Sequence, residues 1–137
     1  MAHTPFPVEV LTPEGEVYSG EVEMVSTRTA LGEIGILAGH EPLLGALEPT
    51  ELRLYKSESE IKRYAQSEGY IQVGAGKVML LVQEIIASEE LDASSLREQL
   101  GEADRAVAEA GQNGEARRVA IRDQKRWTAF LKIAEQR

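Results

Sequence analysis

The apolar residues of this chain follow two different periods, and the change between them near Ile86 is the feature that most limits its fold. Between Val8 and Ile86, segments rich in Val, Ile, Leu and Tyr are interrupted roughly every ten residues by turn sequences such as Thr12-Pro13-Glu14-Gly15. This spacing is typical of a β-sandwich or barrel. After Ile86 the apolar residues recur at helical spacing. The sequence therefore predicts a mostly β domain followed by helices.

Two antiparallel helices are predicted in the C-terminal part, joined by the turn Gly111-Gln112-Asn113-Gly114. Asp92 is a suitable N-cap for the first helix, and the second begins near Glu115. The apolar stripe of the first helix is Leu96, Leu100, Ala103, Val107 and Ala110; that of the second is Ala116, Val119, Ala120, Trp127, Phe130, Leu131 and Ala134. Such alanine-rich stripes bury little area, so we expect the hairpin to rest on another surface, and weakly.

One predicted strand differs from its neighbours because its apolar residues hardly alternate. Residues 77–82 read Lys-Val-Met-Leu-Leu-Val. A continuous apolar run is typical of a strand that is covered on both faces. We therefore expect the helical hairpin to cover the second face of this strand.

Charge is distributed unevenly along the chain. The net charge is −8, but residues 1–114 carry 8 basic and 20 acidic side chains, whereas residues 115–137 carry 7 and 3. The cations of the second helix are Arg117, Arg118, Arg122, Lys125, Arg126 and Lys132. Nucleic acid is not expected as a partner, because the acidic remainder would repel phosphate and no interleaved aromatic residues offer stacking. A solvated helix face and a contact with an acidic protein remain as interpretations.

Catalytic and metal-binding residues are not expected. The chain has no cysteine and two histidines, His3 and His40, so it cannot assemble a histidine cluster for a metal or a histidine-based triad. A hydrolase would need a nucleophile and a base that the sequence does not offer. No apolar run approaches the ~18 residues needed to cross a bilayer, so direct membrane insertion is not expected either.

One segment resembles a known family closely. Residues 29–44, Thr-Ala-Leu-Gly-Glu-Ile-Gly-Ile-Leu-Ala-Gly-His-Glu-Pro-Leu-Leu, are similar to the most recognisable stretch of the epsilon subunit of bacterial F-type ATP synthase. The resemblance continues through residues 10–15, residues 67–73 and Leu91-Asp92, so it covers essentially the whole chain. It implies a sandwich of ten strands in two sheets over residues 1–88 and a regulatory helical hairpin over residues 89–137.

The resemblance also implies a function without catalysis in this chain. The sandwich would bind the gamma subunit and the ring of c subunits in the central stalk, and so couple proton-driven rotation to the distant catalytic head of alpha and beta subunits. The hairpin would extend along gamma to inhibit ATP hydrolysis. The expected location is the cytoplasmic face of the bacterial inner membrane, as a peripheral subunit.

Site residues follow from the same resemblance. Contact with the c-ring is expected from Glu33, Ile34, Gly35, His40 and Glu41, and contact with the catalytic head from Arg117, Arg118, Arg122, Lys125 and Arg126. Some members bind ATP at the start of the first helix through a motif with Arg and Ala, where this chain has Ser95 and Leu96. Tight ATP binding is therefore not expected; any nucleotide contact would come from Asp92 and Arg126.

A second interpretation belongs to another class of protein. The chain would be a stand-alone β-sandwich that binds a small molecule under a helical lid. This alternative predicts an apolar pocket with a few converging polar groups.

Overall fold

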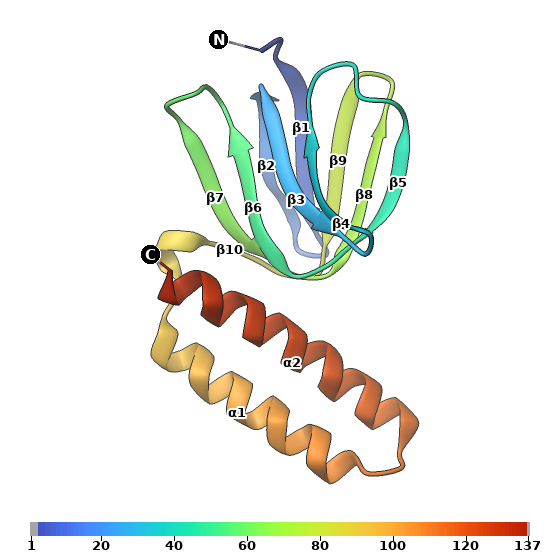
Figure 1. Cartoon of the computed structure of the whole chain (residues 1–137), viewed down its shortest axis with the longest axis vertical. Helices are drawn as coiled ribbons and strands as arrows, with labels where there is room; N and C mark the ends of the chain where they lie inside the picture. Colours follow the sequence, from blue (N-terminus) through green and yellow to red (C-terminus); the bar gives the residue numbers. More distant parts are fainter. Residues whose placement is uncertain (1–2, 137) are drawn as a thin grey trace.

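The computed structural model describes residues 3–136, in which ten strands precede two α-helices. The strands are β1 (Phe6–Thr12), β2 (Gly15–Val22), β3 (Met24–Thr29), β4 (Gly32–Ile36), β5 (Leu43–Leu47), β6 (Thr50–Tyr55), β7 (Ile61–Gln66), β8 (Gly69–Gly74), β9 (Lys77–Val82) and β10 (Ile85–Ala87). A 3₁₀ turn, η1 (Ser88–Glu90), leads to α1 (Ala93–Ala110) and α2 (Gly114–Glu135). The predicted fold class, a β-sandwich followed by a two-helix hairpin, is confirmed (Figure 1).

The strands form two layers that are joined at one corner. One layer has the order β10-β7-β6-β3-β4, and the other has the order β5-β8-β9-β1-β2. They are continuous through a single residue pair, Thr29 of β3 with Leu47 of β5. Strands β1 and β9 pair in parallel, whereas the other strand pairs in the described residues are antiparallel.

The sandwich has two ends, and the helices lie against one of them. Figure 1 shows the hairpin beside the turns at residues 12–15, 29–32, 47–50, 66–69 and 82–85, which we call the hairpin end. The free end carries the loops at residues 36–43, 55–61 and 74–77. Helix α2 is the nearer of the two helices, and it contacts β6 and β7.

The main core lies between the two layers and is built from one residue in two along each strand. Val8 and Val10 of β1 and Leu52 and Leu54 of β6 are fully buried, whereas the residues between them are partly exposed. This alternation follows from the pleat, which points successive side chains to opposite faces. The same core contains Val22, Val25, Ile36, Ile71, Val78 and Leu80.

Both helices begin at the capping residues that their sequences offer. The Asp92 carboxylate accepts from the Ser94 amide at 3.1 Å, and the Asn113 side chain accepts from the Ala116 amide at 3.0 Å. Each bond satisfies one exposed amide of a first helical turn. Gly111, with φ of 53°, ends α1 in a backbone conformation that favours glycine. No helix in residues 3–136 is both long and apolar enough to span a bilayer.

The stripe predicted for the second helix is partly wrong. Ala120, Phe130 and Ala134 are buried as expected, but Ala116 is exposed near the hairpin turn. Ile133, outside the predicted stripe, is buried. The physical reason is that α2 packs on two sides, against α1 and against the sandwich, so its apolar surface is wider towards its C-terminus.

The prediction for residues 77–82 is wrong. Strand β9 buries Val78, Leu80 and Val82, but Leu81 is 45% exposed and Met79 is only partly buried. The hairpin packs against β6 and β7 in the other layer, so it does not cover β9. The apolar residues that look doubly buried in the sequence therefore lie on an open sheet face.

Candidate functional site

An exposed apolar surface covers the outer side of the layer formed by β5, β8, β9, β1 and β2. Tyr70 of β8 pairs with both Ala46 of β5 and Leu81 of β9, and Leu81 pairs with Leu11 of β1. Side-chain alternation points these residues away from the core. Leu44 and Met79 lie in the adjoining row on either side of Gln72. We call Leu11, Leu44, Ala46, Tyr70, Met79 and Leu81 the outer apolar face.

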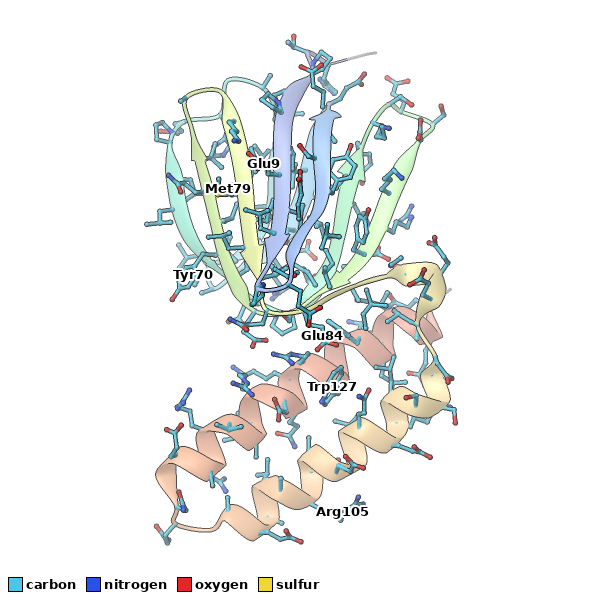
Figure 2. All side chains as sticks on the ribbon, turned by 180° about the vertical axis from the view of Figure 1, so that it is seen from behind. Glu9, Tyr70, Met79, Glu84, Arg105 and Trp127 are labelled. Atoms are coloured by element: carbon cyan, nitrogen blue, oxygen red, sulfur yellow. The ribbon has the colours of Figure 1, made fainter. Side chains whose placement is uncertain are left out.

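Leu44, Tyr70 and Leu81 of the outer apolar face are exposed, and the part of the face nearest α2 borders a cavity that Arg122 also lines. Leu44 is 75% exposed, and the paired Tyr70 and Leu81 are 60% and 45% exposed, values unusual for large apolar side chains on one sheet face. Figure 2 shows Tyr70 projecting from the sheet, with Met79 further along the same side. An exposed apolar surface of this kind is a candidate site for binding another protein.

The residues predicted to contact the c-ring do not form one patch. Glu33 lies where β4 begins, at the hairpin end, whereas His40 and Glu41 lie in the loop that follows β4 at the free end (Figure 1). The strand itself separates the two groups. Ile34 packs partly against the core, so Glu33 and Gly35 are the members of the first group that face solvent.

The two groups also differ in how their polar atoms are used. The Glu33 carboxylate lies 3.9 Å from the Arg28 guanidinium, and its side chain is 82% exposed. Beside it, Leu31 at the tip of the β3–β4 turn is fully exposed. In the other group, Nδ1 of His40 lies 2.7 Å from the carbonyl oxygen of Glu41, which stabilises the loop itself.

Helix α2 is docked on the sandwich through a second, smaller apolar cluster. Phe130 is fully buried there, together with Ile133 of α2, Leu91 before α1 and Ala65 of β7. The ring of Trp127 meets that of Phe130 edge to face, with centroids 5.7 Å apart. This cluster is distinct from the main core, so the sandwich does not need the hairpin to fill its interior.

Ion pairs reinforce the docking beside this cluster. The guanidinium of Arg126 bonds to both carboxylate oxygens of Glu68, at 2.6 and 3.3 Å, and to the carboxylate of Glu84 at 3.2 Å. Arg122 lies 3.9 Å from the same Glu68 carboxylate. The Arg126 side chain is 12% exposed, and its guanidinium lies 5.6 Å from the centre of the Trp127 ring. Figure 2 shows Glu84 and Trp127 on either side of the junction between sandwich and α2.

The other cations predicted to contact the catalytic head have different surroundings. Arg117 donates to the Val107 carbonyl of α1 at 3.3 Å. Arg118 pairs with Glu115 one turn earlier at 2.8 Å, and this hydrogen bond raises the pKa of Arg118 and lowers the pKa of Glu115. Lys125 lines a shallow cleft opposite the β3–β4 turn and forms no ion pair in the described structure.

Asp92 and Arg126, the two residues considered for nucleotide contact, make other interactions in this structure. Asp92 caps α1, and Arg126 is held by two carboxylates. The cavity beside the start of α1 has a volume of about 230 Å³ and is lined by Glu84, Glu90 and Asp92, with no cation among its lining residues. Three carboxylates would repel a phosphate chain.

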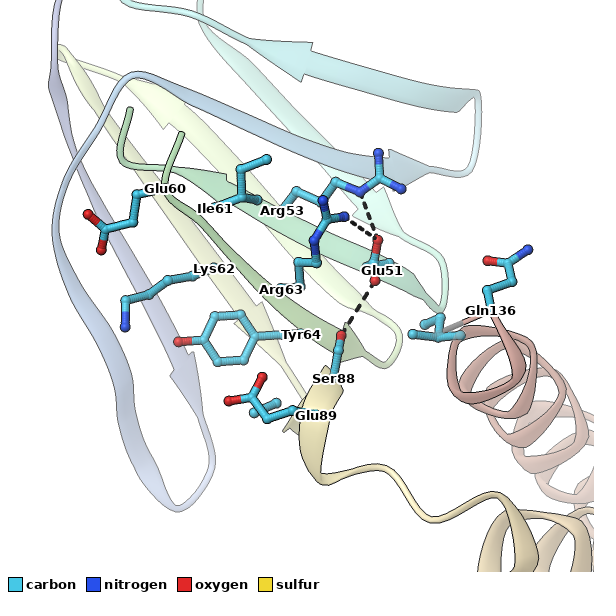
Figure 3. Close-up of a pocket in the computed structure, with 12 residues that line it drawn as sticks. Glu51, Arg53, Glu60, Ile61, Lys62, Arg63, Tyr64, Ser88, Glu89 and Gln136 are labelled. Atoms are coloured by element: carbon cyan, nitrogen blue, oxygen red, sulfur yellow. Dashed lines mark hydrogen bonds and ion pairs between the residues drawn. The ribbon is translucent and has the colours of Figure 1, made fainter. Parts of the chain in front are cut away.

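A groove runs over the outer side of β6 and β7 (Figure 3). It has a volume of about 690 Å³, and Glu51 at its centre accepts from Arg53 at 2.7 Å and from Arg63 at 3.3 Å. The hydrogen bond with Glu51 is the main cause of the raised pKa of Arg53. The groove is a charged surface whose ions pair with each other, so it is not the apolar pocket that a small-molecule binder under a lid would need.

Sequence reasoning missed the outer apolar face and the acidic partners of Arg126. A signal for the face was present: Tyr70 occupies a polar position in the alternating segment 69–73, and Leu81 belongs to the continuous apolar run at residues 77–82. No local pattern indicates that Glu68 and Glu84 reach Arg126, because 58 and 42 residues separate them along the chain.

Taken together, the fold and its surfaces define an interaction subunit: a β-sandwich with an open apolar face and, docked on one end, a helical hairpin whose second helix is basic. Comparison with known proteins agrees. Residues 5–88 match the family described as ATP synthase, Delta/Epsilon chain, beta-sandwich domain. The ATP synthase epsilon chain of Persephonella marina is 45% identical over 98 residues, covering 72% of each chain. That of Sulfurihydrogenibium is 33% identical over 127 residues, covering 93% of this chain and 95% of its own.

The chain therefore belongs to the ATP synthase epsilon chain family, and it is a non-catalytic subunit. Solved structures share its fold. A chain of the Euglena gracilis mitochondrial ATP synthase, in an OSCP, F1 and c-ring structure, superposes with a TM-score of 0.79 at 22% identity, covering all of this chain and 84% of that one. A chain from the central stalk and c-ring of Tetrahymena thermophila ATP synthase gives a TM-score of 0.64 at 17% identity.

Proposed function

We propose that this chain works in the central stalk of a proton-translocating F-type ATP synthase, where residues 1–88 connect gamma to the c-ring and residues 89–137 restrain ATP hydrolysis. The observation that carries this proposal is the separation of the two apolar clusters. The main core lies wholly between the sheets, whereas Phe130 and its neighbours form a smaller cluster at the junction. The hairpin can thus leave while the sandwich stays folded and bound.

Gamma is the proposed occupant of the outer apolar face. The large side chains of this surface are left open to solvent, with Leu44, Tyr70 and Leu81 at 75%, 60% and 45% exposure. A rotor subunit has to stay attached to its shaft while torque passes through it, and burial of apolar side chains gives a salt-independent attachment. His40 and Glu41 precede β5 and Leu44, so they belong at the edge of the gamma contact.

The c-ring contact is proposed for the other end of β4. Glu33 and Gly35 are exposed there, and the fully exposed Leu31 protrudes beside them. A polar tip with one apolar side chain fits the polar loops of a ring of c subunits. Through this contact the chain is held as a peripheral subunit at the cytoplasmic face of the bacterial inner membrane.

Inhibition is proposed to require release of the hairpin from the sandwich. In the docked state Arg126 bonds Glu68 and Glu84 of the sandwich, whereas Arg122 lies 3.9 Å from Glu68 and bonds Asp123 of its own helix at 3.0 Å. Extended along gamma, α2 would present Arg117, Arg118, Arg122, Lys125 and Arg126 to acidic segments of the catalytic beta subunits. The docked structure is then the state that permits hydrolysis.

The gamma contact is tested by binding of purified gamma to a variant with Tyr70→Ser and Leu81→Ser. Removing two exposed apolar side chains from the proposed contact should weaken binding about 100-fold, because interface anchors contribute about 1–2 kcal/mol each or more. Leu31→Ser removes an apolar side chain that is even more exposed but lies at the proposed c-ring contact, so it should bind gamma normally. Equal loss in both variants, or loss in neither, would place gamma elsewhere.

A further inference from the structure

Two glutamates from separate turns of the sandwich converge on one arginine of α2. Glu68 lies in the turn between β7 and β8, and Glu84 lies between β9 and β10, both at the hairpin end. Nε and Nη2 of Arg126 bond the two oxygens of Glu68, and Nη1 bonds Glu84, so each guanidinium nitrogen has a carboxylate partner. The side-on geometry with Glu68 is the bidentate arrangement that fixes orientation as well as charge.

This contact differs from an ordinary surface ion pair in its burial. The Arg126 side chain is 12% exposed, and those of Glu68 and Glu84 are 26% and 38% exposed. Trp127 shields the guanidinium on one side. Partial exclusion of water and a fixed bidentate geometry strengthen such a pair relative to exposed pairs, which contribute little. Arg122 lies farther from Glu68, at 3.9 Å, and bonds Asp123 of its own helix at 3.0 Å.

The same region offers little to a nucleotide. The cavity at the start of α1 is lined by three carboxylates, and Ser95 brings no positive charge. Arg126 would have to abandon Glu68 and Glu84 before it met a phosphate. The chain's own carboxylates thus occupy the cation that an anionic ligand would need.

We infer that Glu68 and Glu84 form a carboxylate clasp that holds the hairpin in the docked state without a nucleotide. Its second consequence rests on the proposed function: the clasp competes with the acidic surface of the catalytic head for Arg122 and Arg126. On release, Arg126 would exchange Glu68 and Glu84 for carboxylates of the catalytic head. The hairpin could then move from the sandwich to the head without leaving a buried arginine unpaired. Ionic strength shifts the balance, because it weakens the clasp.

The test measures hairpin docking directly in the full-length chain. The native sequence has no cysteine, so Glu14→Cys at the hairpin end of the sandwich and Gln112→Cys in the inter-helix turn accept a fluorescent donor and acceptor specifically. Energy transfer between them reports the ratio of released to docked molecules. Emission of Trp127, the single tryptophan, gives a label-free second readout of the junction.

The decisive variant carries Glu68→Gln and Glu84→Gln, and its control carries Glu16→Gln and Glu21→Gln. Both change the net charge equally, but Glu16 and Glu21 are exposed and form no ion pair in the described structure. We expect the first variant to raise the released-to-docked ratio at least about tenfold and the control to leave it unchanged. Raising NaCl from about 20 to about 500 mM should release the native hairpin but have little effect on the first variant.

Three results would overturn the inference: equal ratios in the two variants, a salt response that persists without the two glutamates, or stronger docking with about 1 mM ATP. Circular dichroism of each variant verifies that the sandwich remains folded. The outcome is separable from that of the proposed function. If the hairpin inhibits hydrolysis but docks normally without Glu68 and Glu84, the clasp is wrong; if the clasp controls docking and hydrolysis does not respond, the inhibitory function is wrong.

Discussion

Gly69 shows how one residue at the start of β8 sets the geometry of the layer that carries the outer apolar face. A Cβ at this position would lie 2.0 Å from the Leu81 carbonyl oxygen and 2.8 Å from the Val82 Cα. Both are backbone atoms of the paired strand β9, so they cannot move aside without disturbing the ladder. The position therefore requires glycine because of close backbone approach.

We predict that Gly69→Ala lowers the free energy of unfolding by about 3 kcal/mol, measured by urea denaturation. The matched control is Gly45→Ala in the neighbouring strand β5, where a Cβ would meet methyl groups of Ile71 and Thr29 at 3.6 and 3.7 Å. These are ordinary contacts, so the control should change stability by less than about 1 kcal/mol. Similar losses in both variants would contradict the close-approach explanation.

A second residue-scale feature is a polar bond inside the sandwich. The Thr27 hydroxyl donates to Oε1 of the fully buried Gln66 at 2.6 Å, and Nε2 of Gln66 donates to the Glu48 carbonyl at 3.1 Å. A buried amide without these partners would carry a desolvation cost. The pair links β3 to β7 near the corner where the two layers join.

Thr27→Val keeps the shape of the side chain but removes the donor, so it leaves the Gln66 oxygen unsatisfied. We predict a loss of about 1–3 kcal/mol in the free energy of unfolding. Thr27→Ser retains the hydroxyl and should lose less, since only a methyl group is removed. A serine variant as unstable as the valine variant would show that packing, not hydrogen bonding, matters here.

At the scale of elements, the spacing of apolar residues predicted the β-domain and the two helices that follow it. Strands with alternating apolar residues and the two capped helices were located because their patterns report burial directly. The prediction that the hairpin covers β9 was wrong. A continuous apolar run has the same appearance in the sequence whether its second face is covered within the chain or left open. The partners of Arg126 could not be predicted, because ion pairs between distant turns leave no periodic signal.

Helix α2 is the element whose charges carry the proposed inhibition. We predict that changing Arg117, Arg118, Arg122, Lys125 and Arg126 to Gln abolishes inhibition of ATP hydrolysis while gamma binding is unchanged. The clasp is lost in this variant, so more of the hairpin should be released. Loss of inhibition despite release would isolate the contact between the cations and the catalytic head.

The control for this prediction changes Arg97 and Arg105 of α1 to Gln. These cations lie on the same hairpin but outside the basic helix, and Arg97 bonds Glu135 at 3.2 Å. Inhibition of hydrolysis should persist in the control. Inhibition that survives the five substitutions, or disappears equally in the control, would contradict a specific role for the α2 cations.

At the scale of the whole molecule, the second helix is opposite in charge to the rest of the chain. The first 114 residues carry −12 and the last 23 carry +4, from 8 − 20 and 7 − 3 side chains. In the docked structure the basic helix lies on the acidic sandwich, and the apolar cluster between them is small. Such an arrangement suits a reversible attachment, because ion pairs can be exchanged for similar ones on a partner. The sandwich meanwhile keeps its own core and its own open face.

The central claim is that the sandwich binds gamma and the hairpin inhibits ATP hydrolysis. It is tested most directly by measuring ATP hydrolysis by an alpha-beta-gamma complex. Rates are compared without the chain, with the full-length chain and with a version ending at Ser88, after a gamma pull-down of both versions. We predict that both versions bind gamma but only the full-length chain slows hydrolysis. Inhibition by the truncated version would contradict the role of the hairpin, and failure of both versions to bind gamma would contradict a place in the central stalk.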